Sequence, residues 1–257
     1  MPAMVRPPEA GREEGAGWDT RPASSLPSSF MNPGSGSALS LDPEATWRFG
    51  RRLTPRELDR AARHLSRMDP KLRPVIEKVG KLRLHDGLEP FEALVVSIVF
   101  QQLAGSAAEA ILGRFKGVYG GRFPTPEQLL ATEEGRLRAT GLSRRKVEYL
   151  MDLSRRVAGG SLDLLTLGDR GDEEVISMLD EVKGIGRWTA QMFLIFPLGR
   201  LDVLPSGDLG IRAAVKRLYG LEELPTEDEV MEIGSRWHPY CTVASLYLWR
   251  STDMDEG

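Results

Sequence analysis

Apolar positions along the chain recur with helical spacing, and signals for helix starts stand between them. Val175, Ile176, Leu179 and Val182 lie on one face of a predicted helix. Capping boxes, in which Ser or Thr is followed three residues later by Glu or Gln, occur at Thr54–Glu57, Ser106–Glu109, Thr125–Gln128 and Thr226–Glu229. Further candidate helix starts are Ser143, Asp172, Asp208 and Pro239. No alternating segment indicates a strand, so the pattern predicts an all-α fold of about eight to ten short helices.

The first 45 residues differ from the rest of the chain. They are rich in Pro, Gly and Ser, and their apolar residues follow no helical or strand period. Such a segment buries too little apolar surface to offset the entropy lost on ordering. We therefore expect residues 1–45 to form a disordered arm and residues 46–252 to form one helical domain.

Composition narrows the class of protein. Hydrophobic residues make up 41% and charged residues 28% of the chain, as in ordinary globular proteins. The apolar stretch Ala93–Phe100 is too short to cross a bilayer, and the first residues lack the apolar core of a secretory signal. Cys241 is the single cysteine, which excludes internal disulfides and sites built from four cysteines of one chain. These features predict a soluble, intracellular protein with no membrane partner.

Charge is nearly balanced overall, at −3, but it is unevenly distributed. The segment from Arg48 to Arg83 holds twelve Lys or Arg against four Asp or Glu. A block of this kind fits a nucleic-acid footprint, and it fits a solvated, arginine-rich helix face equally well.

Gly184 and Gly186 flank one apolar residue between a helix that ends near Val182 and a second helix that begins at once. Two glycines this close allow positive φ and the close approach of another backbone. The first N–H groups of the second helix then point outward without partners, with the positive end of the helix dipole behind them. This arrangement suits a phosphate oxygen and ignores base sequence. A tight turn that needs glycine only for its shape is the alternative.

The loop Leu204–Arg212 contains Pro and Gly and delivers a single carboxylate, Asp208. Taken alone, Asp208 is best interpreted as the N-cap of the helix that follows. A hairpin, a short helix and then a Pro/Gly loop with one aspartate together resemble the helix–hairpin–helix, Gly/Pro–Asp superfamily of DNA glycosylases.

Other segments resemble the DNA-3-methyladenine glycosylase II family within that superfamily. Phe91–Tyr119 is similar to the helix pair that opens its catalytic domain, and Thr140–Lys146 is similar to one of its helix starts. Arg236–Tyr240, followed by Ala244–Trp249, resembles its closing helix. The resemblance implies a helix–hairpin–helix glycosylase fold with two helical lobes and the active site between them. We expect no counterpart of the sheet-bearing N-terminal domain of longer bacterial members, because residues 1–45 are of low complexity and residues 46–85 have a helical pattern.

The resemblance also implies roles for single residues. Asp208 would stabilise the positive charge that builds on the deoxyribose as the base leaves, and could assist the attacking water. Trp188 and Tyr240 would form an aromatic wall for a flipped, cationic purine. Gln102 or Leu103 would fill the gap that the flipped nucleotide leaves. Core packing is the alternative role of Trp188, Tyr240 and Leu103, and a plain surface position that of Gln102.

The hairpin supplies most of the predicted DNA contacts, which are Lys183, Gly184, Ile185, Gly186 and, outside it, Ser143. The resemblance implies no required cofactor and no metal held by side chains. It does imply a monovalent cation, Na⁺ or K⁺, on backbone carbonyls near Asp180, Val182 and Gly184. The three histidines, His64, His85 and His238, are scattered and show no metal-ligand spacing.

Bifunctional members of the superfamily carry a lysine just before the start of the second helix, and its amine forms a Schiff base with the sugar. The matching position here is Trp188, which has no nucleophile. The resemblance thus implies a monofunctional, monomeric glycosylase. It would release purines of the 3-methyladenine or 7-methylguanine type from double-stranded DNA and start base excision repair.

Two other functions fit the same residues. A non-catalytic helix–hairpin–helix DNA-binding module would use the hairpin in the same way, and the role of Asp208 separates it from an enzyme. A glycosylase for oxidised or mismatched bases would share both hairpin and carboxylate, because the shape of the pocket decides which base is accepted.

Overall fold

The structure is a computed structural model that describes residues 53–82, 88–103 and 105–253, so the predicted arm 1–45 lies outside the described residues. Within these ranges the chain holds twelve α-helices, two 3₁₀-helices and no strand, which confirms the all-α prediction and exceeds the helix count expected. The elements are α2 (Pro55–Met68), α3 (Arg73–Val79), α4 (Pro90–Phe100), α5 (Gly105–Gly117), α6 (Pro126–Leu130), α7 (Glu134–Arg138), α8 (Arg144–Ala158), η3 (Leu167–Asp169), α9 (Asp172–Asp180), α10 (Arg187–Ile195), α11 (Leu209–Tyr219), α12 (Glu227–Gly234), η4 (Ser235–Trp237) and α13 (Cys241–Asp253).

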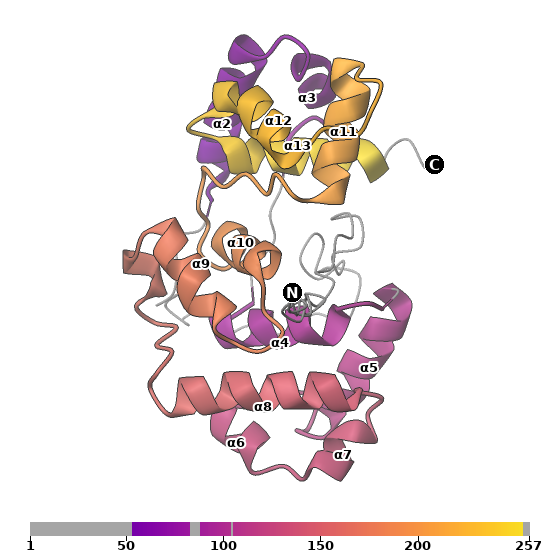
Figure 1. Ribbon diagram of the computed structural model, residues 1–257, viewed down its shortest axis with the longest axis vertical. Helices are drawn as coiled ribbons and strands as arrows, with labels where there is room; N and C mark the ends of the chain where they lie inside the picture. The colour runs from indigo at the N-terminus through magenta and orange to yellow at the C-terminus, as the bar shows by residue number, and fades with distance from the viewer. Residues whose placement is uncertain (1–52, 83–87, 104, 254–257) are drawn as a thin grey trace, which may run out of the picture.

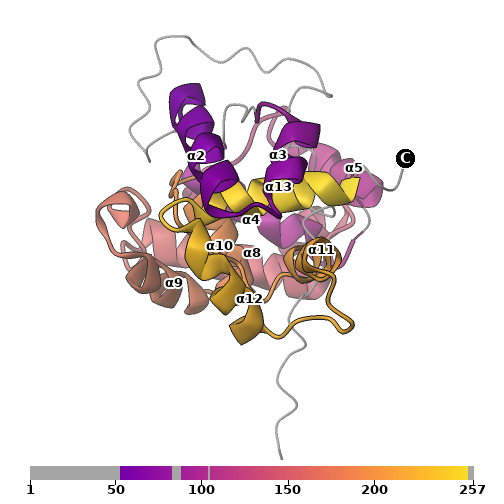
Figure 2. The same cartoon turned by 90° about the horizontal axis from the view of Figure 1, so that it is seen from above.

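The helices form two groups (Figure 1). One group joins the two ends of the described chain, because α2 and α3 both pack on α13, which in turn packs on α11. Figure 2 shows α2 and α3 beside α13 when this group is seen from above. The other group runs from α4 to α8, and the pair α9 and α10 lies against it through contacts between α10 and α4. These groups correspond to the two predicted lobes.

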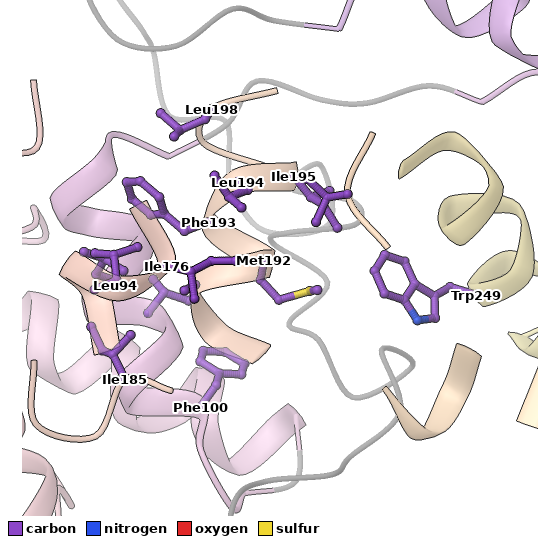
Figure 3. Close-up of a cluster of buried hydrophobic side chains, with 14 of the residues drawn as sticks. Leu94, Phe100, Ile176, Ile185, Met192, Phe193, Leu194, Ile195, Leu198 and Trp249 are labelled. Carbon is purple, nitrogen blue, oxygen red and sulfur yellow. The ribbon is translucent and has the colours of Figure 1, made fainter. Parts of the chain in front are cut away.

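The core explains how α10 is positioned between the lobes. Helix α4 is apolar on nearly all sides, and its residues from Ala93 to Phe100 are buried except Ser97. A helix of this composition is stable only when surrounded. Figure 3 shows the α10 side chains between Leu94 and Phe100 on one side and Trp249 of α13 on the other. The second half of α10 is thereby packed against both lobes.

Most predicted caps are confirmed. The capping boxes of Thr54, Thr125 and Thr226 form, and the side chains of Ser143 and Asp208 accept N–H bonds from the first turns of α8 and α11.

Three predicted helix starts are wrong. Ser106 lies inside α5, and Gly171 rather than Asp172 caps α9, whose acidic first turn interacts favourably with the helix dipole instead. Helix α13 begins at Cys241 and not at Pro239, and the unpaired first amide of the helix, that of Cys241, donates to Asp202 of a preceding loop at 3.1 Å.

The part of the basic block that is described, on α2 and α3, has its arginines and lysines exposed while Leu58, Ala61 and Leu65 are buried. This is the geometry of an arginine-rich solvated face, and its use as a DNA footprint stays a prediction. No helix of the described residues has the length and apolar character needed to cross a bilayer.

Candidate active site

Asp208 is fully buried where the two lobes meet. It stands at the N-terminus of α11, and its Oδ1 accepts hydrogen bonds from the Ile211 amide at 2.8 Å and from Trp249 Nε1 at 2.9 Å. Its Oδ2 accepts a hydrogen bond from Trp188 Nε1 at 2.8 Å. The predicted capping role and a central position in the candidate site therefore coexist, because the cap uses only one of the two carboxylate oxygens.

Burial governs the charge state of this carboxyl. Loss of hydration raises the pKa of Asp208, while the hydrogen bonds from Trp249, Ile211 and Trp188 act in the opposite direction. A carboxylate held this way is fixed in direction and poorly hydrated. Such a group interacts strongly with any positive charge that develops beside it.

Trp188 connects the two lobes. It lies in the first turn of α10 and is half-buried, and its indole reaches across to Asp208 of α11. The sequence predicted that both residues belong to one site, and the structure brings them together. The N–H edge of the indole donates the hydrogen bond to Asp208. That the Trp188 ring also forms a wall for a flipped base stays a prediction.

Trp249 is a site residue that the sequence analysis did not assign. It is fully buried on α13, donates to Asp208, and stacks on Phe196 with ring centroids 6.5 Å apart. The sequence does place it in the closing helix that carries the resemblance. No local pattern, however, pairs an indole with a carboxylate 41 residues earlier.

Tyr240 takes a different position from the one expected for a partner of Trp188. Its ring packs edge-on against His64 of α2, with centroids 5.1 Å apart, and its amide donates to Trp237 O at 2.8 Å. Among the described residues, no hydrogen bond or ring contact joins Tyr240 to Asp208 or Trp188. Its predicted place in the base pocket stays a prediction.

The turn after α4 is strained at one residue. Gln102 has φ +55° and is the single non-glycine residue with positive φ in the described ranges. It is exposed, whereas the neighbouring Leu103 is half-buried against the hydrophobic core. Strained backbone of this kind is concentrated at functional sites. The structure thus distinguishes the two candidates by exposure, and which of them enters DNA stays a prediction.

The predicted hairpin between α9 and α10 forms, and Gly184 is essential to its shape. Its φ is +80°, and a Cβ on it would lie 2.1 Å from Cδ2 of Tyr149. Gly186 is the N-cap of α10 with extended backbone, and no side chain caps that helix. The first N–H groups of α10 are therefore available to an anion. Ile185 is buried, so its side chain packs in the core and any contact with DNA would involve its backbone.

The hairpin is docked on its neighbours. The Lys183 amide donates to Asp152 of α8 at 3.1 Å, and its Nζ lies 3.3 Å from Glu148 Oε1 in an exposed ion pair. On the other side, Gln101 Nε2 donates to Gly184 O at 2.6 Å. Gln101 was not predicted, because its partner is distant in sequence. The turn that holds Gln102 is thus tied to the hairpin.

Two further predicted groups have structural partners. Ser143 caps α8 by accepting a bond from the Lys146 amide at 3.2 Å, and its contact with DNA stays a prediction.

His238 is less isolated than the sequence spacing indicated, because Asp202 and Cys241 lie beside it. His85 lies outside the described residues.

A helical fold with a Gly-x-Gly hairpin and a buried aspartate at the next helix start defines the class of helix–hairpin–helix DNA glycosylases. Residues 95–239 match the model of the "HhH-GPD superfamily base excision DNA repair protein", and the chain belongs to this superfamily.

Relatives and solved structures agree with this assignment. The chain is 36% identical over 202 residues to DNA-3-methyladenine glycosylase 1 of Schizosaccharomyces pombe, covering 77% of this chain and 89% of the relative. A structure of 3-methyladenine DNA glycosylase from that organism with abasic DNA superposes with a TM-score of 0.69, covering 76% of this chain and 97% of the other at 36% identity. For DNA-3-methyladenine glycosidase of Bacillus halodurans the TM-score is 0.70 at 41% identity, with 76% and 90% covered.

Proposed function

We infer that this protein is a DNA glycosylase that releases alkylated bases from DNA and so initiates base excision repair. Its superfamily and the 3-methyladenine glycosylases named above support this function. The observation that carries it is the buried carboxylate of Asp208, held by two indole N–H groups beside the hairpin.

The geometry suits hydrolysis of the bond between base and sugar. As this bond breaks, positive charge builds on the deoxyribose, and a fixed, poorly hydrated carboxylate stabilises that charge more than water does. Trp188 and Trp249 keep Asp208 aligned, so little reorganisation is needed as the charge develops. A cationic alkylated purine is already a good leaving group, and an aromatic wall can hold it without a strong general acid.

We propose further that the enzyme is monofunctional and acts as an intracellular monomer on double-stranded DNA. The position of the Schiff-base lysine of bifunctional members is occupied by Trp188, and Lys183 is paired with Glu148. The N–H groups at the start of α10 would hold a phosphate, and the target base would be flipped out of the duplex. Borohydride trapping on substrate DNA tests this, and a covalent adduct that disappears in Lys183→Ala would contradict it.

A monovalent cation fits the hairpin carbonyls. Val182 O accepts one N–H bond from Ile185 at 3.0 Å and Gly184 O accepts one from Gln101, which leaves each oxygen a second lone pair. We propose that Na⁺ or K⁺ binds these oxygens with that of Asp180 and adds positive charge near the phosphate site. Affinity for undamaged duplex should then be higher in KCl or NaCl than in tetramethylammonium chloride of equal ionic strength.

The catalytic role of Asp208 is tested by Asp208→Asn. We expect release of 3-methyladenine from methylated duplex DNA to fall by at least about 100-fold, while binding to that DNA is retained. The exposed Asp163→Asn is a matched control for the loss of one carboxylate.

The outcomes separate the three candidate functions. Full release by Asp208→Asn would refute its catalytic role, and no release by either protein would favour a DNA-binding module. Release of oxidised or mismatched bases alone would identify the other kind of glycosylase.

A further inference from the structure

A second cluster of chemically versatile side chains lies apart from the hydrogen bonds of Asp208. Asp202 comes from the loop between α10 and α11, His238 follows η4, and Cys241 is the first residue of α13. One ligand atom of each residue lies within 4.8 Å of the other two. Asp202 and His238 are exposed and Cys241 is buried, so the cluster is open to solvent on one side.

The geometry does not fit a nucleophilic triad. Asp202 Oδ2 lies 2.8 Å from His238 Nδ1, and Cys241 Sγ lies 3.6 Å from the same nitrogen. A triad needs the acid and the nucleophile on opposite nitrogens of the imidazole.

A sulfur, a nitrogen and an oxygen atom within 4.8 Å of one another suit a divalent zinc ion. Zinc binds thiolate sulfur at about 2.3 Å, imidazole nitrogen at about 2.0–2.1 Å and carboxylate oxygen at about 2.0–2.2 Å in tetrahedral sites. Sulfur and nitrogen atoms bound at these distances are about 3.6 Å apart in a tetrahedron. This matches the 3.6 Å between Cys241 Sγ and His238 Nδ1. Only small shifts of the exposed Asp202 and His238 side chains would complete the set.

We propose that Asp202, His238 and Cys241 form a Zn²⁺ site, with water as the fourth ligand. On binding, the thiol proton and any proton on Nδ1 leave to solvent, and the imidazole keeps its proton on Nε2. The ion would take over the contact that the Asp202–His238 hydrogen bond now makes.

The site would connect two segments that matter to Asp208. The loop that leads to Asp208 is already held to the start of α13, since Thr242 Oγ1 accepts a bond from Val203 N at 3.0 Å and Thr242 N donates to Leu201 O at 3.1 Å. Helix α13 also carries Trp249, the donor to Asp208. Zinc would therefore clamp together the two segments that supply this carboxylate and one of its donors.

The single cysteine allows a direct test. Co²⁺ is used as a spectroscopic probe on the untagged chain of 257 residues after treatment with a chelator, because a cobalt–thiolate bond gives a charge-transfer absorption. Cys241 is the only thiol in the sequence, so this absorption can report on no other residue. We expect the band to appear with one Co²⁺ per chain and to be abolished by a stoichiometric addition of Zn²⁺.

Variants define the ligand set. Cys241→Ser should abolish the band. His238→Gln and Asp202→Asn should each weaken the binding of Co²⁺ and Zn²⁺ by at least about tenfold. The control Asp163→Asn should leave both the band and the binding unchanged. Zn²⁺ should raise the melting temperature of the parent chain and of Asp163→Asn but not of the three ligand variants. Thermal melting measured without metal shows whether each variant is folded. If Cys241→Ser is unstable, substitution of the exposed His238 still tests the ligand set.

Two results would overturn the proposal. One is the absence of a thiolate band when the parent chain is folded and the thiol is reduced. The other is a band of unchanged affinity in both His238→Gln and Asp202→Asn, which would mean that Cys241 binds metal without the cluster.

Discussion

Within the described residues, two aspartates are fully buried and accept an indole N–H, yet they differ in their surroundings. Asp69 follows α2, and its Oδ1 accepts bonds from the amides of Lys71 at 3.0 Å and Leu72 at 3.3 Å. Its Oδ2 accepts bonds from Trp237 Nε1 at 2.8 Å and from the hydroxyl of Tyr219. All these donors belong to the group of helices that contains Asp69 itself.

The donors of Asp208 come from both groups of helices, and among the described residues the half-buried Trp188 is the one side chain that donates to its Oδ2. The backbone of Gly210 also donates to this carboxyl and lowers its pKa. Both oxygens of Asp69 accept two bonds, which uses the approximately four lone-pair directions of a carboxylate. The comparison indicates that a buried carboxylate whose donors all belong to one group of helices holds that group together. A carboxylate bonded from both groups, through the half-buried Trp188, lies instead at the junction between the lobes, where we expect the substrate.

Replacing each aspartate by asparagine should separate these two functions, and this is the largest effect we expect. Asp208→Asn should reduce base release by at least about 100-fold with little change in stability. Burial raises the pKa of Asp208, so its ionised form lowers stability above that pKa. Asparagine removes this penalty but loses the bond to Trp188, and the two changes oppose one another.

Asp69→Asn should behave in the opposite way. An amide cannot accept bonds at all four positions, so at least one buried donor loses its partner and the free energy of unfolding should fall by about 1–3 kcal/mol. Urea unfolding measures the stability of Asp208→Asn and Asp69→Asn, and base release per folded molecule measures their activity. A strong loss of release in Asp69→Asn at unchanged stability would contradict the division of roles.

The next effect concerns Trp249, which is fully buried like Trp237, the indole donor to Asp69. Trp249→Phe removes one hydrogen bond and leaves space beside Phe196, so the free energy of unfolding should fall by about 1–3 kcal/mol. Thermal and urea unfolding measure this change. An unchanged stability would show that the α13 contact to Asp208 adds little to the fold.

Trp188→Phe should have the smallest effect on stability but a distinct effect on the pH profile. The hydrogen bond from Trp188 lowers the pKa of Asp208, so its removal should raise that pKa further. Release needs the ionised carboxylate and is lost as pH falls through the pKa, so the acidic limb should move to higher pH. Single-turnover release measured across the acidic range shows this, and an unmoved limb would mean that the limb belongs to another group.

Local features of the fold could be predicted from the sequence. Capping boxes and glycine positions gave the starts of α2, α6 and α12 and the hairpin before α10, because each depends on residues within one turn of chain. Asp208 could be placed at a helix start for the same reason, and the family resemblance connected it with Trp188.

The features that could not be predicted depend on contacts between segments that are distant in the sequence. Trp249 and Asp208, Trp237 and Asp69, and His238 and Asp202 are pairs separated by 41, 168 and 36 residues. No periodic pattern encodes such a pair, because each is fixed by how helices pack. The positive φ of Gln102 was missed for a related reason, since a glutamine gives no local signal for that conformation.

The hydrogen bond from Gln101 to Gly184 has a consequence for how a lesion could be located. It joins the strained turn at Gln102 to the backbone that would hold a phosphate, with Tyr149 packed against the same glycine. If the hairpin binds a phosphate and this turn enters the duplex, as predicted, the hydrogen bond would keep a fixed distance between the two points of contact. The position of the bound phosphate would then determine which nucleotide the turn meets.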